Sequence, residues 1–155
     1  MDAKVIWDHG LTFTGTADSG FKVPLGTSPS VGGDDDGFRP MELLATGLAG
    51  CTAMDVISIL LKKRQDITAF EVRVHTEQAS DFPKVFTSAR IEFLVTGRNV
   101  DEEAVRRSME LSAVRYCPAQ AMFGNIMPIR LFYQIFEVGE NGETSPVKSD
   151  ELVLQ

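Results

Sequence analysis

The sequence predicts an α+β fold with the element order β-β-β-α-β-β-α-α-β. Two observations support this class. Segments with strand character occur on both sides of one long apolar stretch, Pro40–Lys63, which is of helical length, and a second helical pattern begins near Asp101. Strands and helices therefore form separate groups instead of alternating regularly along the chain. With 155 residues, of which 43% are hydrophobic, the chain is long enough for one well-packed domain.

The first forty residues favour short strands joined by turns. Three segments rich in β-branched and aromatic residues are expected to be strands: Lys4–Asp8, Leu11–Thr16 and Phe21–Leu25. Pro24 places the third of them at a sheet edge or a strand end. Residues 26–40 are dominated by turn formers, and a loop of this length is either functional or a solvated acidic connector.

The long stretch that follows is the clearest helix in the sequence. Pro40 suits the first helical turn, and the basic residues at 62–64 suit the negative end of the helix dipole. Nearly every position between them is apolar or small. We therefore expect a helix that is buried on most of its sides.

The second half of the chain returns to strands and then to helices. The expected elements are a strand hairpin, a long helix, a short helix and a last strand: Ala69–Glu77 with Val85–Thr96, Asp101–Tyr116, Pro118–Phe123 and Ile129–Glu137. Residues 1–138 are thus predicted to form a single domain, and residues 139–155 a polar, acidic C-terminal tail.

Composition and charge exclude several classes of function. The net charge of −7 argues against a nucleic-acid partner, which would require a basic face. We find neither a signal peptide nor a run of about 18 apolar residues, so we expect neither export nor a membrane span. The two cysteines form no metal-binding motif, so no metal and no cofactor is expected. We expect a cytoplasmic protein in which the two thiols are the groups of interest.

Cys51 lies in the middle of the long helix, after Gly47 and Gly50. Glycine destabilises a helix interior by about 1 kcal/mol, so two within one turn suggest close approach of another backbone or a ligand. The alternative is that Cys51 is a small hydrophobic residue, buried and inert, as free cysteines often are.

Cys117 directly precedes Pro118 and is therefore expected at the N-cap of a new helix. Free backbone N–H groups and the positive end of the helix dipole favour a thiolate at that position. Arg115 could add positive charge. The alternative is a packing cysteine at a corner between two helices.

Together the two thiols suggest a redox pair. A thiolate that attacks a peroxide becomes a sulfenic acid, which a second thiol converts to a disulfide for an external dithiol to reduce. This chemistry requires no metal or organic cofactor. It does require a nearby cation to hold the thiolate and an apolar pocket when the peroxide is organic.

Two motifs carry a resemblance to a known family. Residues 40–44 and 47–55, the latter reading Gly-Leu-Ala-Gly-Cys-Thr-Ala-Met-Asp, resemble the central-helix motif of the OsmC/Ohr family, the osmotically inducible and organic hydroperoxide resistance proteins. Residues 112–118, Ser-Ala-Val-Arg-Tyr-Cys-Pro, resemble its second-cysteine motif. The resemblance extends over residues 4–137.

The resemblance implies an intertwined homodimer with active sites at the dimer interface. It implies thiol-dependent reduction of organic or small hydroperoxides in oxidative stress defence, with Cys51 as the peroxidatic and Cys117 as the resolving cysteine. The partners would be a second copy of the chain, the hydroperoxide and a dithiol reductant.

The chain departs from the family at the residues that should activate the thiol. Met41 stands where peroxidases of the family carry a glutamate, and Val31 falls near the place of their arginine. Glu42 is one position late, on the side of the helix opposite the cysteine, and Arg39 could supply a guanidinium from the loop. Both are candidate supporting residues.

Asp55 is the third candidate supporting residue, one helical turn after Cys51 and on the same face. An unpaired carboxylate beside a thiol raises the thiol pKa, so Asp55 could equally be a structural, hydrogen-bonded carboxylate. Two functions remain open: a thiol peroxidase, or a non-catalytic dimeric protein that binds an apolar or thiol-containing small molecule in its interface pocket.

Overall fold

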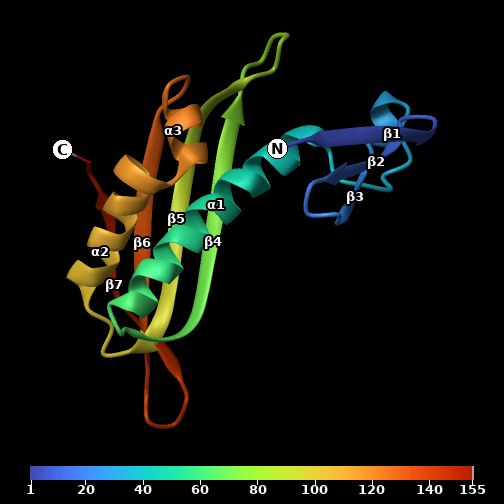
Figure 1. The fold of residues 1–155 in the computed structure, drawn as a ribbon. Coiled ribbons are helices and arrows are strands. Elements are labelled where there is room, and N and C mark those ends of the chain that lie inside the picture. The colour runs from blue at the N-terminus through green and yellow to red at the C-terminus, as the bar shows by residue number, and fades with distance from the viewer. Residues whose placement is uncertain (155) are drawn as a thin grey trace. The chain divides into compact units, whose positions relative to one another are not determined.

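A computed structural model describes residues 1–154 as an α+β fold with two sheets and three helices (Figure 1). The chain divides into two compact units, Met1–Leu44 and Ala45–Gln155. The predicted class and the first nine elements in their order are confirmed. Strands β1, β2 and β3 contact mainly one another. The single domain over residues 1–138 stays a prediction.

The N-terminal unit is a small antiparallel sheet with the order β1-β2-β3, in which β1 is Ala3–His9, β2 is Thr12–Ala17 and β3 is Lys22–Leu25. Gly15 faces Val23 so closely that a Cβ at this position would lie 3.0 Å from the valine side chain. A single 3-10 turn interrupts the loop that follows.

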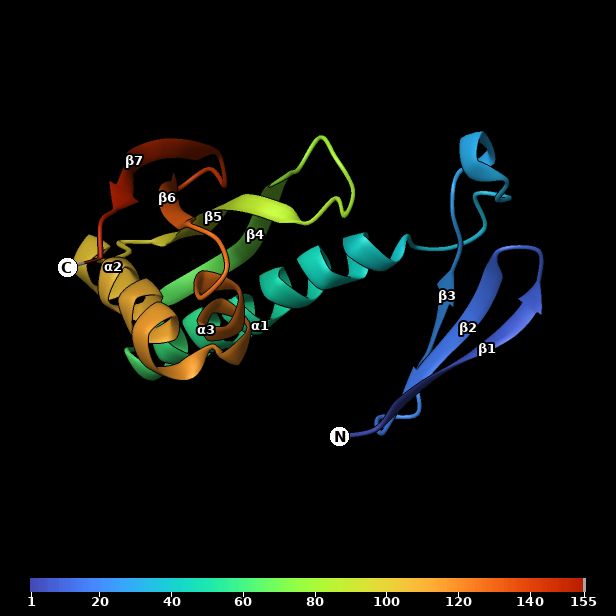
Figure 2. The same ribbon diagram turned by 90° about the horizontal axis from the view of Figure 1, so that it is seen from above.

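The second unit is a four-stranded sheet with helices on one face, which Figure 2 shows from above. The strands are β4 (Asp66–Gln78), β5 (Phe86–Arg98), β6 (Ile129–Val138) and β7 (Thr144–Leu152), in that spatial order. The β4–β5 pair is the predicted hairpin. β5 and β6 run parallel, joined by the helical connection between them.

Alternate residues of the central strands form the core. On β5 and β6 the side chains that face the helices are buried, namely Ile91, Phe93 and Val95 on β5 and Leu131, Tyr133 and Ile135 on β6. Most of their neighbours along each strand, on the opposite face, are partly exposed. Val105 and Met109 of α2 (Glu102–Leu111) fill the same core. This period-two burial explains why these strands alternate in sequence.

A buried tyrosine joins α2 to the sheet. The Tyr133 hydroxyl donates a hydrogen bond of 2.5 Å to Glu102 and accepts one of 3.2 Å from Arg106. Lys148 of β7 also approaches Glu102, at 3.5 Å. Burial, followed by the bond to Glu102, raises the pKa of Tyr133, so this hydroxyl remains a donor at neutral pH.

The expected C-terminal tail is wrong. Residues 144–152 form β7, which pairs antiparallel with β6, and Leu152 is buried opposite Leu131. The polar composition that predicted a tail reflects an edge strand, most of whose residues face solvent.

The expectation that α1 (Pro40–Lys62) is buried on most sides is also wrong for the single chain. Only one stripe with a four-residue repeat is buried, namely Leu48, Thr52, Val56 and Leu60. Met54 and Leu61 are 69% and 58% exposed. By length and composition alone the helix could cross a membrane, a property it shares with core helices.

The second long helix ends earlier than predicted. Regular α-helix stops at Leu111, and Ser112–Tyr116 continue as a π turn in which the Cys117 amide donates to the Ser112 carbonyl at 2.9 Å. Turns of this kind often mark functional sites. Here the turn directs the chain into α3 (Pro118–Gly124).

Candidate functional site

Cys51 lies on α1 at the border of the buried stripe and is half-buried. Its neighbour Thr52 points into the core and is fully buried. The helix therefore presents a partly accessible thiol beside an inaccessible hydroxyl, one residue apart.

Cys117 is the N-cap of α3, as predicted. Its backbone is extended (φ −79°, ψ 104°), Pro118 opens the helix, and the backbone N–H of Gln120 donates to the sulfur at 3.4 Å. The side chain is 3% exposed. The N-cap position is thus formed, but in a site largely closed to water.

The fold brings the two thiols close enough that Cys51 contributes to the pKa of Cys117, although 66 residues separate them in sequence. The pKa of Cys117 is raised to about 11. Burial is the largest cause and Cys51 adds to it, against the lowering effect of the N–H groups of Gln120 and Ala119. The expectation that the N-cap would favour a thiolate is therefore wrong, because desolvation outweighs the helix end. Cys117 is a protonated thiol at neutral pH.

A buried polar chain runs beside the thiol pair. The amide of Gln120 donates to the Thr52 hydroxyl at 2.7 Å, Thr52 and Ser112 are 3.2 Å apart, and Ser112 donates to Asp55 at 3.2 Å. Because Ser112 has one hydrogen, which goes to Asp55, Thr52 must donate to Ser112. All the donors of this chain, which we call the polar chain, thus point toward the Asp55 carboxylate.

Sequence reasoning identified Asp55 but missed Gln120, Thr52 and Ser112 as site residues. Asp55 is held by a hydrogen bond, as the structural interpretation of this carboxylate proposed. Two of the missed residues carried a signal, since Thr52 and Ser112 lie within the two cysteine motifs. Gln120 is the third residue of a short helix, and nothing in its local sequence marks it.

The other two predicted supporting residues lie in the N-terminal unit and contact each other. Arg39 forms ion pairs with Glu42 at 2.9 Å and with Asp35 at 3.0 Å. The Arg39 backbone N–H also donates to Glu42 at 3.0 Å. This backbone bond, followed by the bond from the Arg39 guanidinium, lowers the pKa of Glu42. Glu42 thus reaches back to satisfy a donor just before the helix, as in a capping box.

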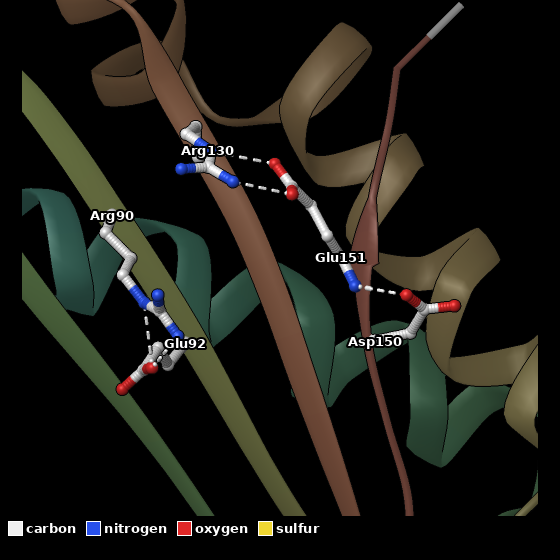
Figure 3. A network of polar contacts seen from close by, with 5 residues as sticks. All are labelled: Arg90, Glu92, Arg130, Asp150 and Glu151. Atoms are coloured by element: carbon white, nitrogen blue, oxygen red, sulfur yellow. Dashed lines mark hydrogen bonds and ion pairs between the residues drawn. The ribbon is translucent and has the colours of Figure 1, made fainter.

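A second polar cluster lies on the open face of the larger sheet (Figure 3). It contains the ion pairs Arg90–Glu92 at 2.6 Å and Arg130–Glu151 at 2.7 Å, and it borders a cavity of about 470 Å³. The Arg90 guanidinium lies 3.8 Å from the centre of the Phe132 ring. Each of these arginines is paired with a carboxylate of the same cluster, so its charge is already neutralised. The thiol pair is therefore the stronger candidate site.

Fold and site together define a class: an α+β protein in which a long helix and the N-cap of a later helix bring two thiols close together. Residues 33–132 match the OsmC-like protein family, and the chain belongs to it. Protein YhfA of Escherichia coli K12 is 36% identical over 135 residues, which cover 87% of this chain and 98% of YhfA.

Solved structures agree on the fold. An OsmC-like protein from Mycoplasma pneumoniae superposes with a TM-score of 0.72 at 17% identity, covering 89% of this chain and 96% of its own. An organic hydroperoxide resistance protein OsmC from Legionella pneumophila gives 0.59 at 16% identity, covering 86% and 94%.

Proposed function

We propose that the chain is a cysteine-based hydroperoxide reductase of the cytoplasm, with Cys51 as the attacking and Cys117 as the resolving thiol. The proximity of the two thiols supports this proposal, because a resolving cysteine must lie within reach of the sulfur that is oxidised. Exposure favours the assignment of roles, since Cys51 is half-buried and Cys117 is 3% exposed.

The proposed reaction takes place in three balanced steps. The Cys51 thiol gives up its proton and the thiolate attacks the terminal oxygen of a hydroperoxide. The O–O bond breaks, Cys51 becomes a sulfenic acid, and the alkoxide takes up the released proton and leaves as the alcohol. The Cys117 sulfur then attacks the Cys51 sulfur, and its proton leaves with the hydroxide as water. An external dithiol reduces the resulting disulfide and is itself oxidised to a disulfide. A resolving thiol with a pKa of about 11 still carries the proton that the second step requires.

A second copy of the chain is the partner that we propose. Apolar side chains remain exposed along α1 and around α3: Met54, Leu61, Val114, Met122 and Ile126 are all more than half exposed. Exposed apolar surface of this kind marks protein interfaces. The test is sedimentation of the wild type against Met54→Lys. A matched control is Phe82→Lys at an 89% exposed position in the β4–β5 turn, which should remain dimeric.

The experiment for the activity is stopped-flow consumption of an organic hydroperoxide with a dithiol reductant. Cys51→Ser should abolish consumption, whereas Cys117→Ser should retain one turnover and accumulate a sulfenic acid that a dimedone probe traps. Equal inactivity of the wild type and both variants would contradict the proposal.

That outcome would favour the second candidate, a non-catalytic dimeric protein that binds an apolar or thiol-containing small molecule. The specific observation in its favour is that the charged group linked to the site is the Asp55 carboxylate, reached from Thr52 through Ser112. A carboxylate disfavours a thiolate.

A further inference from the structure

We propose that Gln120 and Thr52 are positioning residues that hold the two thiols in register and set how readily they form a disulfide. This inference rests on the proposed function in the role that it gives to that disulfide. It concerns the equilibrium between the dithiol and the disulfide, which can be measured without a peroxide.

Gln120 contacts both thiol-bearing segments. Its backbone N–H donates to the sulfur of Cys117 at 3.4 Å, and its side-chain amide donates to Thr52, the residue after Cys51, at 2.7 Å. Gln120 is 5% exposed and Thr52 is fully buried, so water does not compete for these bonds. One residue therefore connects the start of α3 to the part of α1 that carries Cys51.

The polar chain keeps this connection in one orientation. Thr52 accepts from Gln120 and donates to Ser112, and Ser112 donates to Asp55. Removing the Thr52 hydroxyl would leave a buried amide donor and a buried hydroxyl acceptor without their partner, so α1 and α3 would have to shift or admit water.

Such a shift bears directly on disulfide formation. A disulfide requires a sulfur–sulfur length of about 2.05 Å and a Cβ–Cβ separation of about 3.5–4.5 Å, with a restricted dihedral angle. Displacing α3 against α1 reduces the fraction of molecules that meet these conditions. Loss of the polar chain should therefore destabilise the disulfide relative to the dithiol.

The test equilibrates the reduced protein with buffers of glutathione and glutathione disulfide. The two protein thiols transfer two electrons and two protons to glutathione disulfide, which becomes two glutathione molecules, and mass spectrometry after alkylation counts the oxidised fraction. Thr52→Val should lower the equilibrium constant by about 10-fold or more. Thr52→Ser, which retains the hydroxyl, should stay within about threefold of the wild type.

Ser108→Ala is the matched control. Ser108 is as completely buried as Ser112 and lies one turn earlier, but its hydroxyl bonds to the Ala104 carbonyl of its own helix at 2.6 Å. Loss of this hydroxyl should leave the equilibrium constant within about twofold of the wild type. If Thr52→Val fails to fold by circular dichroism, Gln120→Met removes the same bond while keeping the backbone N–H that contacts Cys117.

Three results would overturn the inference: no disulfide in the wild type, an equilibrium constant in Thr52→Val equal to that of the wild type, or an equal fall in Ser108→Ala. A protein that forms the disulfide and responds to these substitutions, yet reduces no peroxide, would contradict the proposed function alone.

Discussion

The proton on Cys117 gives the most direct physical test of the site. Burial raises its pKa from an ordinary value of 9.0 to about 11. At pH 9 an ordinary thiol of that kind would be half ionised, whereas a thiol with a pKa of about 11 would be roughly 1% ionised. At pH 9 the two cases therefore differ by about half a thiolate per chain.

Thiolate absorbance at 240 nm, followed from pH 7 to pH 12 under reducing conditions, measures this difference. Subtracting the titration of Cys117→Ala from that of the wild type isolates the Cys117 step, which should have its midpoint near pH 11. In Cys51→Ala the step should remain above pH 9, because burial is the largest cause of the shift. A step that is complete below pH 9 in either protein would refute the reasoning.

The same shift links stability to pH. The native state keeps its proton up to about pH 11, whereas the unfolded thiol loses its proton near pH 9.0. The contribution to the free energy of unfolding is therefore fully present below pH 9 and is lost as the pH rises through 11. Since one pKa unit corresponds to about 1.4 kcal/mol, the loss is about 3 kcal/mol. Urea unfolding of the wild type and Cys117→Ala at pH 8 and pH 11 measures it.

Three substitutions elsewhere test the packing that supports the site. Tyr133→Phe removes the hydrogen bonds to Glu102 and Arg106, both partly exposed, and should destabilise the fold by about 0.5–1.5 kcal/mol in urea unfolding. Tyr116→Phe at a 49% exposed position should change little. Phe93→Ala opens a cavity in the core and should lower the free energy of unfolding by about 3–5 kcal/mol. Phe82→Ala, at an 89% exposed position, should change it little. Asp101→Ala removes the side chain that caps α2 and should cost about 1 kcal/mol, and an unchanged melting temperature would contradict the assignment.

The predictable part of the fold is the part with a local cause. Period-two alternation over residues 69–77 identified β4, and Pro118 identified both the break after the π turn and the N-cap at Cys117. By contrast, β7 is an edge strand, and its polar sequence carries no apolar face by which to recognise it. The parallel pairing of β5 with β6 depends on where the intervening helices pack, which no local pattern specifies.

The site shows the same division. Cysteine motifs pointed to Cys51 and Cys117, but the pKa of Cys117 depends on burial by distant elements, which outweighs the favourable helix end that the local sequence provides. Gln120 bonds to a threonine 68 residues away, so its role appears only when α3 has packed against α1. Long-range contacts thus decide what the local pattern leaves open.

The parallel pair of β5 and β6 also has a consequence for the time course of folding. Parallel strands cannot form by a tight turn, so the connection through α2, the π turn and α3 must close before β6 can pair with β5. Loop closure of this kind slows folding relative to the local β4–β5 hairpin. Cys117 lies on that connection and Cys51 precedes the hairpin. The two sulfurs therefore meet late, and their cross-linking during refolding should report completion of the sheet rather than early collapse.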